Sequence, residues 1–155
     1  MPAPTRSPPN SRVDCIFCQI IAGRASAEVV ARSDRAVAFL TIGPLTEGHT
    51  LVVPVRHATD LTEVSNQDTQ AVWQLVHDVG GRLHAAGLAE GVNLFVMSGV
   101  AAEQAILHLH IHVVPRRRGD GLDLNRWWES KVRKVDPARH AEVARKIRSS
   151  GAPVG

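Results

Sequence analysis

The chain has 155 residues, of which 44% are hydrophobic and 21% charged, and its formal net charge is +3. This length suffices for one globular domain with a sizeable core, and no apolar run reaches the ~18 residues that a membrane span needs. The mild positive charge favours a phosphate or another small anion as ligand. We therefore expect neither a nucleic acid nor a membrane as a partner.

The N-terminal residues carry two signals. The stretch MPAPTRSPPNSR holds four prolines and no apolar segment, which excludes a secretory signal and predicts a disordered tail over residues 1–13. Cys15 and Cys18 follow as the two cysteines of the chain. A pair with this spacing suits a reducing compartment, so a cytoplasmic protein is expected. The pair could be half of a zinc site, a redox pair or two packed thiols.

Hydrophobic patterning predicts the remaining elements in chain order. Helices are expected over residues 15–23, 66–86 and 137–148, and strands over 28–32, 36–42, 49–55, 92–98 and 106–115. Ser65 and Asp68 resemble a capping box before the long helix, and Pro54 suggests a strand end. Residues 116–135 show no clean period. Because the strands are joined by short connections or one helix, the pattern predicts an α+β fold, an antiparallel sheet with a helix packed on one face.

Residues 108–115 read HLHIHVVP. Because side chains alternate along a strand, His108, His110 and His112 are expected to share one open face, with the intervening apolar residues in the core. Neighbouring histidines would lie ~6.8 Å apart, which makes it hard for them to share a zinc ion whose bonds to nitrogen are ~2.0–2.1 Å. Separate roles are therefore expected, among them metal ligation, proton transfer and nucleophilic attack.

The segment HLHIHVV resembles the pattern of the histidine triad (HIT) family, His-φ-His-φ-His-φ-φ, where φ is apolar. CIFCQIIAG near the start, AFLTIGPLTEGHTLVVPVRH in the first half, and a glycine followed by Gln104 before the triad are similar to nucleotide-binding members. The resemblance covers roughly residues 15–118. It implies an HIT-like fold with about five strands, one long helix and a short N-terminal helix. The domain would span 14–118, followed by a C-terminal extension over 119–155.

The resemblance also implies an activity. Family members attack the α-phosphorus of nucleoside phosphoramidates or dinucleoside polyphosphates, and an adenine nucleotide is the expected substrate. His110, the middle histidine, would be the nucleophile and would form a covalent nucleotidyl-histidine. His112 would offset phosphate charge as a cation, and His49 would support the triad. A homodimer is implied as well.

Further residues are assigned only through the resemblance. Some bacterial-type members complete a structural zinc site of the Cys₂His₂ kind, whose ligands here would be Cys15, Cys18, His57 and His108. The residues that match the nucleotide-binding wall and loop are Ile16, Phe17, Ile20, Phe39, Thr41, Ile42 and Gln104.

Three positions depart from the family pattern. Thr41 stands where many relatives have an acid that contacts the ribose, and Met97 and Ala105 replace an amide and a hydroxyl residue. These changes weaken expected contacts and motivate an alternative, a nucleotide-binding regulatory protein with little turnover. A second alternative is a metal-dependent hydrolase with the triad as ligands. Trp127 and Trp128 could select substrate in a partner subunit or pack on the domain.

Overall fold

A computed structural model describes residues 14–151, so the predicted tail lies outside the described residues. The chain separates into two compact units, one up to Asp120 and one from Gly121 onward. The boundary falls two residues beyond the predicted end of the domain at residue 118. Each unit is described by itself.

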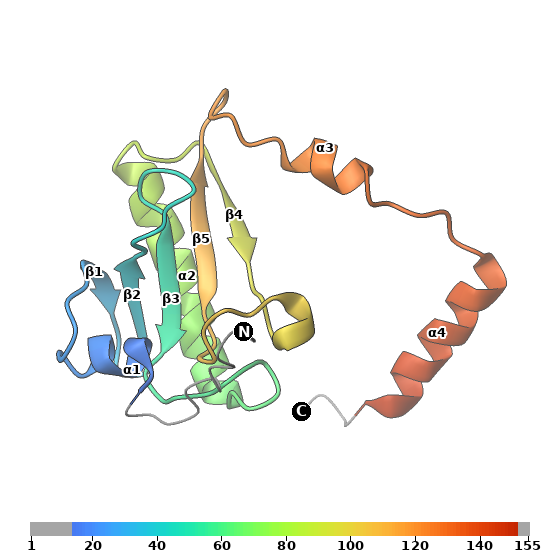
Figure 1. The fold of residues 1–155 in the computed structure, drawn as a ribbon, viewed down its shortest axis with the longest axis horizontal. Coiled ribbons are helices and arrows are strands. Elements are labelled where there is room, and N and C mark those ends of the chain that lie inside the picture. The colour runs from blue at the N-terminus through green and yellow to red at the C-terminus, as the bar shows by residue number, and fades with distance from the viewer. Residues whose placement is uncertain (1–13, 152–155) are drawn as a thin grey trace, which may run out of the picture. The chain divides into compact units, whose positions relative to one another are not determined.

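The first unit is built on one antiparallel sheet of five strands in the order β1-β2-β3-β5-β4 (Figure 1). The strands are β1 (Val29–Arg32), β2 (Ala36–Leu40), β3 (Thr50–Pro54), β4 (Gly91–Phe95) and β5 (Ile111–Arg116). This arrangement confirms the predicted α+β class and the antiparallel sheet. β3 ends at Pro54, as expected for a residue that has no N–H to donate to a ladder.

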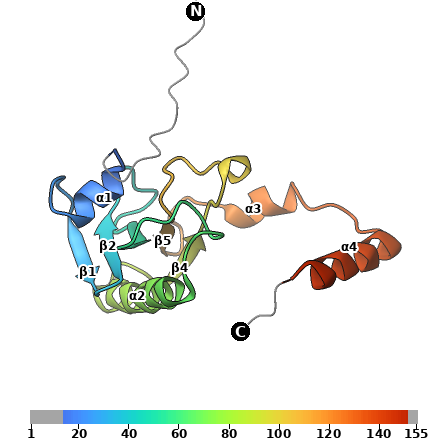
Figure 2. The same cartoon turned by 90° about the horizontal axis from the view of Figure 1, so that it is seen from below.

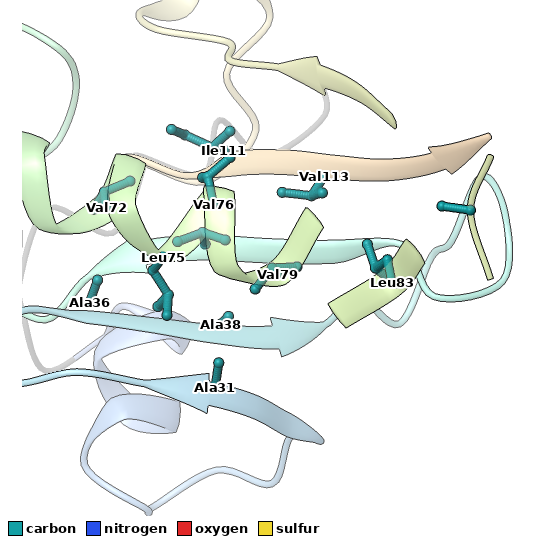
Figure 3. Packing of buried hydrophobic residues seen from close by; sticks show 12 residues of the cluster. Ala31, Ala36, Ala38, Val72, Leu75, Val76, Val79, Leu83, Ile111 and Val113 are labelled. Carbon is teal, nitrogen blue, oxygen red and sulfur yellow. The ribbon is translucent and has the colours of Figure 1, made fainter. Parts of the chain in front are cut away.

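The long helix α2 (Asn66–Ala85) covers one face of the sheet. Ser65 caps its N-terminus by accepting a hydrogen bond from the amide of Asp68, which confirms one of the two bonds of the predicted capping box. Figure 3 shows the apolar stripe of the helix pointing at small and β-branched residues of the sheet. The buried cluster on this side contains Ala31, Ala36, Ala38, Val52, Val72, Leu75, Val76, Val79, Leu83, Ala89, Ile111 and Val113.

The short helix α1 (Ile16–Ile21) lies on the other side of the sheet from α2 (Figure 2). A second buried cluster forms here, and its members are Cys15, Phe17, Val37, Phe39, Leu51 and Val53. The rings of Phe17 and Phe39 meet edge to face with centroids 5.4 Å apart. The alternation of side chains in β2 and β3 thus divides each strand between two cores.

The structure corrects the predicted start of the histidine strand. β5 begins at Ile111, so His112 lies in the strand while His108 and His110 precede it. The ladder to β3 begins at the pair Val52–Ile111. Two residues farther along β3 stands Pro54, which cannot extend the ladder.

The segment before β5 is held by other contacts and is buried. The amide of Leu109 donates to the carbonyl oxygen of Ala58 at 2.8 Å. His108 and His110 are 0% and 4% exposed. The prediction that the imidazoles occupy an open sheet face is therefore wrong for these two residues, because the loop after β3 and helix α1 cover them.

The second unit contains two helices, α3 (Leu124–Glu129) and α4 (Pro137–Ser150). α4 was predicted, and Asp136 caps it by accepting from the amide of Ala138. α3 was not predicted, because a helix of six residues is too short to show a period. Within residues 14–151, no helix combines the length and the apolar character needed to cross a membrane.

Candidate functional site

Four predicted ligands come together between α1, the loop after β3 and the segment before β5. The nearest donor atoms of Cys15, Cys18, His57 and His108 all lie within 4.8 Å of one another. The sulfur of Cys18 is 3.3 Å from Nδ1 of His57, and the sulfur of Cys15 is 3.4 Å from Nδ1 of His108. Two thiols and two imidazoles are the donor set of a closed structural zinc site. This cluster could hold a metal ion.

The orientation of His108 fits that donor set. Its Nε2 lies 2.9 Å from the carbonyl oxygen of Pro54, and since a carbonyl can only accept, Nε2 carries the proton. The lone pair of Nδ1 therefore faces both sulfur atoms, at 3.4 and 3.6 Å. A ligand histidine that donates its other N–H to a backbone carbonyl is the usual arrangement around protein-bound zinc. The Pro54 that ends β3 thus also aims His108.

In His110 the other ring nitrogen is hydrogen-bonded to the backbone. Its Nδ1 donates to the carbonyl oxygen of His108 at 2.7 Å, which leaves the lone pair on Nε2. The ring of Phe17 meets the His110 ring edge to face, with centroids 5.3 Å apart. A buried imidazole with one nitrogen fixed as a donor and the other left with a lone pair is suited to nucleophilic attack.

A hydrogen-bonded chain sets the tautomers of the other two histidines. The amide of Leu45 donates to Nδ1 of His49 at 3.0 Å, so the proton of neutral His49 is on Nε2. That Nε2 lies 3.0 Å from Nδ1 of His112, which must accept. Neutral His112 consequently carries its proton on Nε2. Among residues 14–151, this Nε2 is the one buried side-chain nitrogen or oxygen without a hydrogen-bond partner.

Burial keeps these imidazoles neutral. The pKa of His112 is lowered to about 4, mainly by burial and also by the neighbouring His110 and His49. Burial also lowers the pKa of His110 and of His49. The free site therefore offers a neutral N–H donor at His112, where the sequence analysis expected a cation. A bound phosphate would supply the missing acceptor for this N–H.

An apolar cleft of about 220 Å³ lies beside the histidines, between α1 and the edge of β2 and β3. Six of the seven residues predicted to bind nucleotide line it, namely Ile16, Phe17, Ile20, Phe39, Thr41 and Ile42. Phe17 belongs both to this cleft and to the contact with His110. Phe17 therefore connects the wall of the cleft to His110.

Gln104, the seventh predicted residue, is not among the residues that line the cleft, and its side chain forms hydrogen bonds with backbone atoms. Its side-chain oxygen accepts from the amide of Gly99 at 2.7 Å, and its Nε2 donates to the carbonyl oxygens of Thr59 and Ile106 at 2.6 and 3.0 Å. The amide group thus joins two loops that flank the site.

Several contributors were missed by the sequence predictions. The cleft is also lined by Ser26, Ala27, Leu40, Leu51 and Ile106, whose small or apolar side chains look like those of many other residues in the chain. The amide of Leu45 carries no sequence signal, because every residue except proline has one.

The tautomer chain can be tested by the ¹⁵N chemical shifts of the imidazoles. At pH 7, His112 should be neutral with its proton on Nε2, and it should become protonated only near the pKa of about 4. Because the unfolded chain takes up this proton near the ordinary value of 6.5, the free energy of unfolding should fall as pH decreases from 6.5 toward about 4. The slope of this pH dependence is proportional to the number of protons taken up on unfolding, and His112→Gln should reduce that number by about one. A cationic His112, or a proton on Nδ1, at pH 7 would contradict the chain.

Comparison of the sequence with known proteins shows which family the chain resembles. The HIT domain family matches residues 22–119. The HIT-like protein Rv1262c of Mycobacterium tuberculosis is 35% identical over 127 residues, which are 82% of this chain and 86% of that protein. The adenylylsulfatase HINT3 of Arabidopsis thaliana is 34% identical over 109 residues, which are 70% of this chain and 55% of that protein.

A solved structure of similar fold also belongs to the histidine triad family. A zinc-bound histidine triad family protein from Mycobacterium smegmatis has 29% sequence identity to this chain and a TM-score of 0.69. The structural match covers 91% of this chain and 100% of that chain. The matched region contains the sheet, the long helix and all three histidines of the triad. The chain belongs to the HIT family.

Proposed function

We propose that this protein is a nucleotidyl hydrolase or transferase that acts at the α-phosphate of nucleoside phosphoramidates or dinucleoside polyphosphates. The observation that carries the proposal is the pairing of a lone pair on His110 Nε2 with an unpartnered N–H on His112. The centroids of these two rings are 5.0 Å apart. One group is suited to attack phosphorus, and the other to bind a phosphate oxygen or the leaving atom.

Two steps account for the reaction. The lone pair of His110 Nε2 forms an N–P bond while the bond from phosphorus to the leaving oxygen or nitrogen breaks. The leaving atom takes the electron pair, accepts a hydrogen bond from His112 and then gains a proton from the solvent. Water attacks next, so that a P–O bond forms, the N–P bond breaks, the pair returns to Nε2, and a proton is released. In a transferase, another hydroxyl or amine replaces water.

The apolar cleft supports a nucleoside as the bound group. Phe17 and Phe39 offer aromatic edges to a flat base, and the cleft leads from the base toward His110. The similarity to an adenylylsulfatase supports adenylyl transfer as the reaction type and adenine as the base. Cytoplasmic placement stays a prediction.

We further propose that the Cys₂His₂ cluster holds one structural zinc ion. The zinc-bound relative from Mycobacterium smegmatis supports this identity. When bound, zinc would cross-link α1 to the segment that carries the triad, and four protein ligands would leave no open position for substrate. His110 and His112 are not members of the cluster, which makes the metal-dependent hydrolase the weaker alternative. A regulatory protein with little turnover remains the alternative that Thr41, Met97 and Ala105 motivate.

The nucleophile is tested by His110→Ala. We expect turnover of an adenosine phosphoramidate to fall by about a thousandfold or more, because the variant lacks the Nε2 lone pair that would attack phosphorus. Metal content and melting temperature should stay near wild type. A slow substrate that is quenched early should leave an acid-labile nucleotide on His110. Unchanged activity in the alanine variant would rule out the mechanism.

The metal is tested by Cys15→Ser. Wild type should hold about one zinc per chain, and the variant should lose it together with ~2 kcal/mol or more of stability, since structural zinc binding is coupled to folding. Elemental analysis and thermal melting report both quantities. His77→Ala is a matched control, because that ring is 84% exposed and distant in sequence from every ligand. Wild-type protein without metal would refute the site.

Ribose recognition is tested at Thr41. Its hydroxyl accepts from the amide of Gly43 at 3.3 Å and offers no carboxylate. Loss of a charge-assisted bond to ribose costs ~1.5–3 kcal/mol, or roughly ten- to a hundredfold in affinity. We expect AMP and its 2′-deoxy analogue to bind alike, and Thr41→Asp to tighten AMP only. Strong ribose preference in wild type would mean that another residue recognises the sugar.

We also propose a homodimer that joins through β4. This strand is an edge of the sheet, and its Val92 and Leu94 are each 40% exposed. An apolar edge strand with unpaired backbone groups is a template for a second strand. Leu94→Glu should convert the dimer to a monomer in sedimentation velocity, with Glu90→Lys near the strand as a polar control. A monomeric wild type at ~100 μM, well above the Kd of a stable interface, would contradict the dimer.

A further inference from the structure

A buried carboxylate lies at the N-terminus of α2. The side chain of Asp68 is 3% exposed. Its Oδ1 accepts from Nη1 of Arg35 at 2.9 Å, and its Oδ2 accepts from the hydroxyl of Ser65 at 2.6 Å. Nε of Arg56 lies 3.3 Å from Oδ2. The hydrogen bond from Ser65 and the two guanidinium groups hold the pKa of Asp68 below its usual value, so it is an anion.

Arg56 connects this carboxylate to the cluster, because it directly precedes His57 in the loop after β3. Adjacent Cα atoms are separated by about 3.8 Å, so an anchor at residue 56 restricts where residue 57 can go. The other side of the loop is also anchored. The carbonyl oxygens of Ala58 and Thr59 accept from the amide of Leu109 and from Nε2 of Gln104.

The anchored residue is at the more accessible side of the cluster. Cys15 and His108 are buried, whereas Cys18 and His57 are partly exposed. A metal ion leaves a site of this kind after one ligand moves away, and the partly exposed loop histidine has the freer path. A restraint on His57 should therefore slow metal release more than an equally strong restraint on one of the buried ligands, Cys15 or His108.

We propose that Asp68 and Arg56 are positioning residues for the metal site, and that their ion pair holds His57 in place and slows the release of zinc. The inference rests on the proposed zinc site. The role is carried by the chain connection between Arg56 and His57 and by the burial of the carboxylate, which makes its partners costly to lose.

The two arginines provide a matched test. Both pair with Asp68, and both are about half exposed, at 52% and 61%, but only Arg56 adjoins a ligand. Zinc release from the full chain to a chromogenic chelator is followed in wild type, Arg56→Met, Arg35→Met and Arg56→Lys. The free energy of unfolding of the zinc-loaded proteins is measured in parallel.

Arg56→Met should release zinc about tenfold faster, the lower end of what loss of a supporting bond does to metal sites. Arg35→Met should keep the wild-type rate although it loses the shorter ion pair and at least as much stability. Arg56→Lys should restore much of the slow release. In an Asp68→Asn background, Arg56→Met should add nothing, because the pair is already broken.

Three results would overturn the proposal. Equal acceleration by the two methionine variants would reduce the ion pair to general stability. A wild-type rate in Arg56→Met would show that the loop needs no such anchor. If wild type holds no zinc, the metal site itself fails, and this result is distinguishable because it appears before any variant is compared.

Discussion

The two nitrogens of His108 connect the fold to the chemistry. Nε2 donates to Pro54 and Nδ1 faces two thiols, so this ring joins the end of β3, helix α1 and the segment before β5. It is fully buried, and a buried imidazole needs a partner at each nitrogen. Because both nitrogens are engaged, His108 is not available for substrate. The next histidine along the chain is thereby the first one that can act.

The same rule of paired donors and acceptors orders the rest of the triad. The carbonyl of His108 takes the proton of His110 Nδ1, and the Leu45 amide begins the chain that leaves an N–H on His112. A lone pair and a donor are thus placed next to each other without any charge in the resting site. Such a neutral pair can receive an anionic phosphate without first losing a counter-ion. The three histidines of the motif differ in their partners: His108 Nε2 and His110 Nδ1 donate to backbone carbonyls, whereas His112 Nδ1 accepts from the His49 side chain. The three different tasks that we propose for them follow from this difference.

Much of this arrangement was predictable, and the exceptions share a cause. The helical spacing after Ser65 and the alternation in the strands indicated α2 and the antiparallel sheet, because burial patterns are local in sequence. The four members of the Cys₂His₂ cluster and six of the residues that line the cleft followed from the family resemblance. The late start of β5 depends on Pro54 in a strand that is distant in the sequence, and the tautomers depend on backbone groups. Gln104 was predicted to bind nucleotide, yet its side chain forms hydrogen bonds with backbone atoms of two loops. Patterns of side chains carry little information about such contacts.

The division of tasks within the triad is the central claim, and X-ray absorption at the zinc K edge tests it most directly. The zinc-loaded protein should show two sulfur neighbours at about 2.3 Å and two nitrogen neighbours at about 2.0–2.1 Å. The spectrum of the His110→Ala variant should be the same. Three or more nitrogen neighbours in wild type, with one fewer in the variant, would place His110 on the metal and contradict the account.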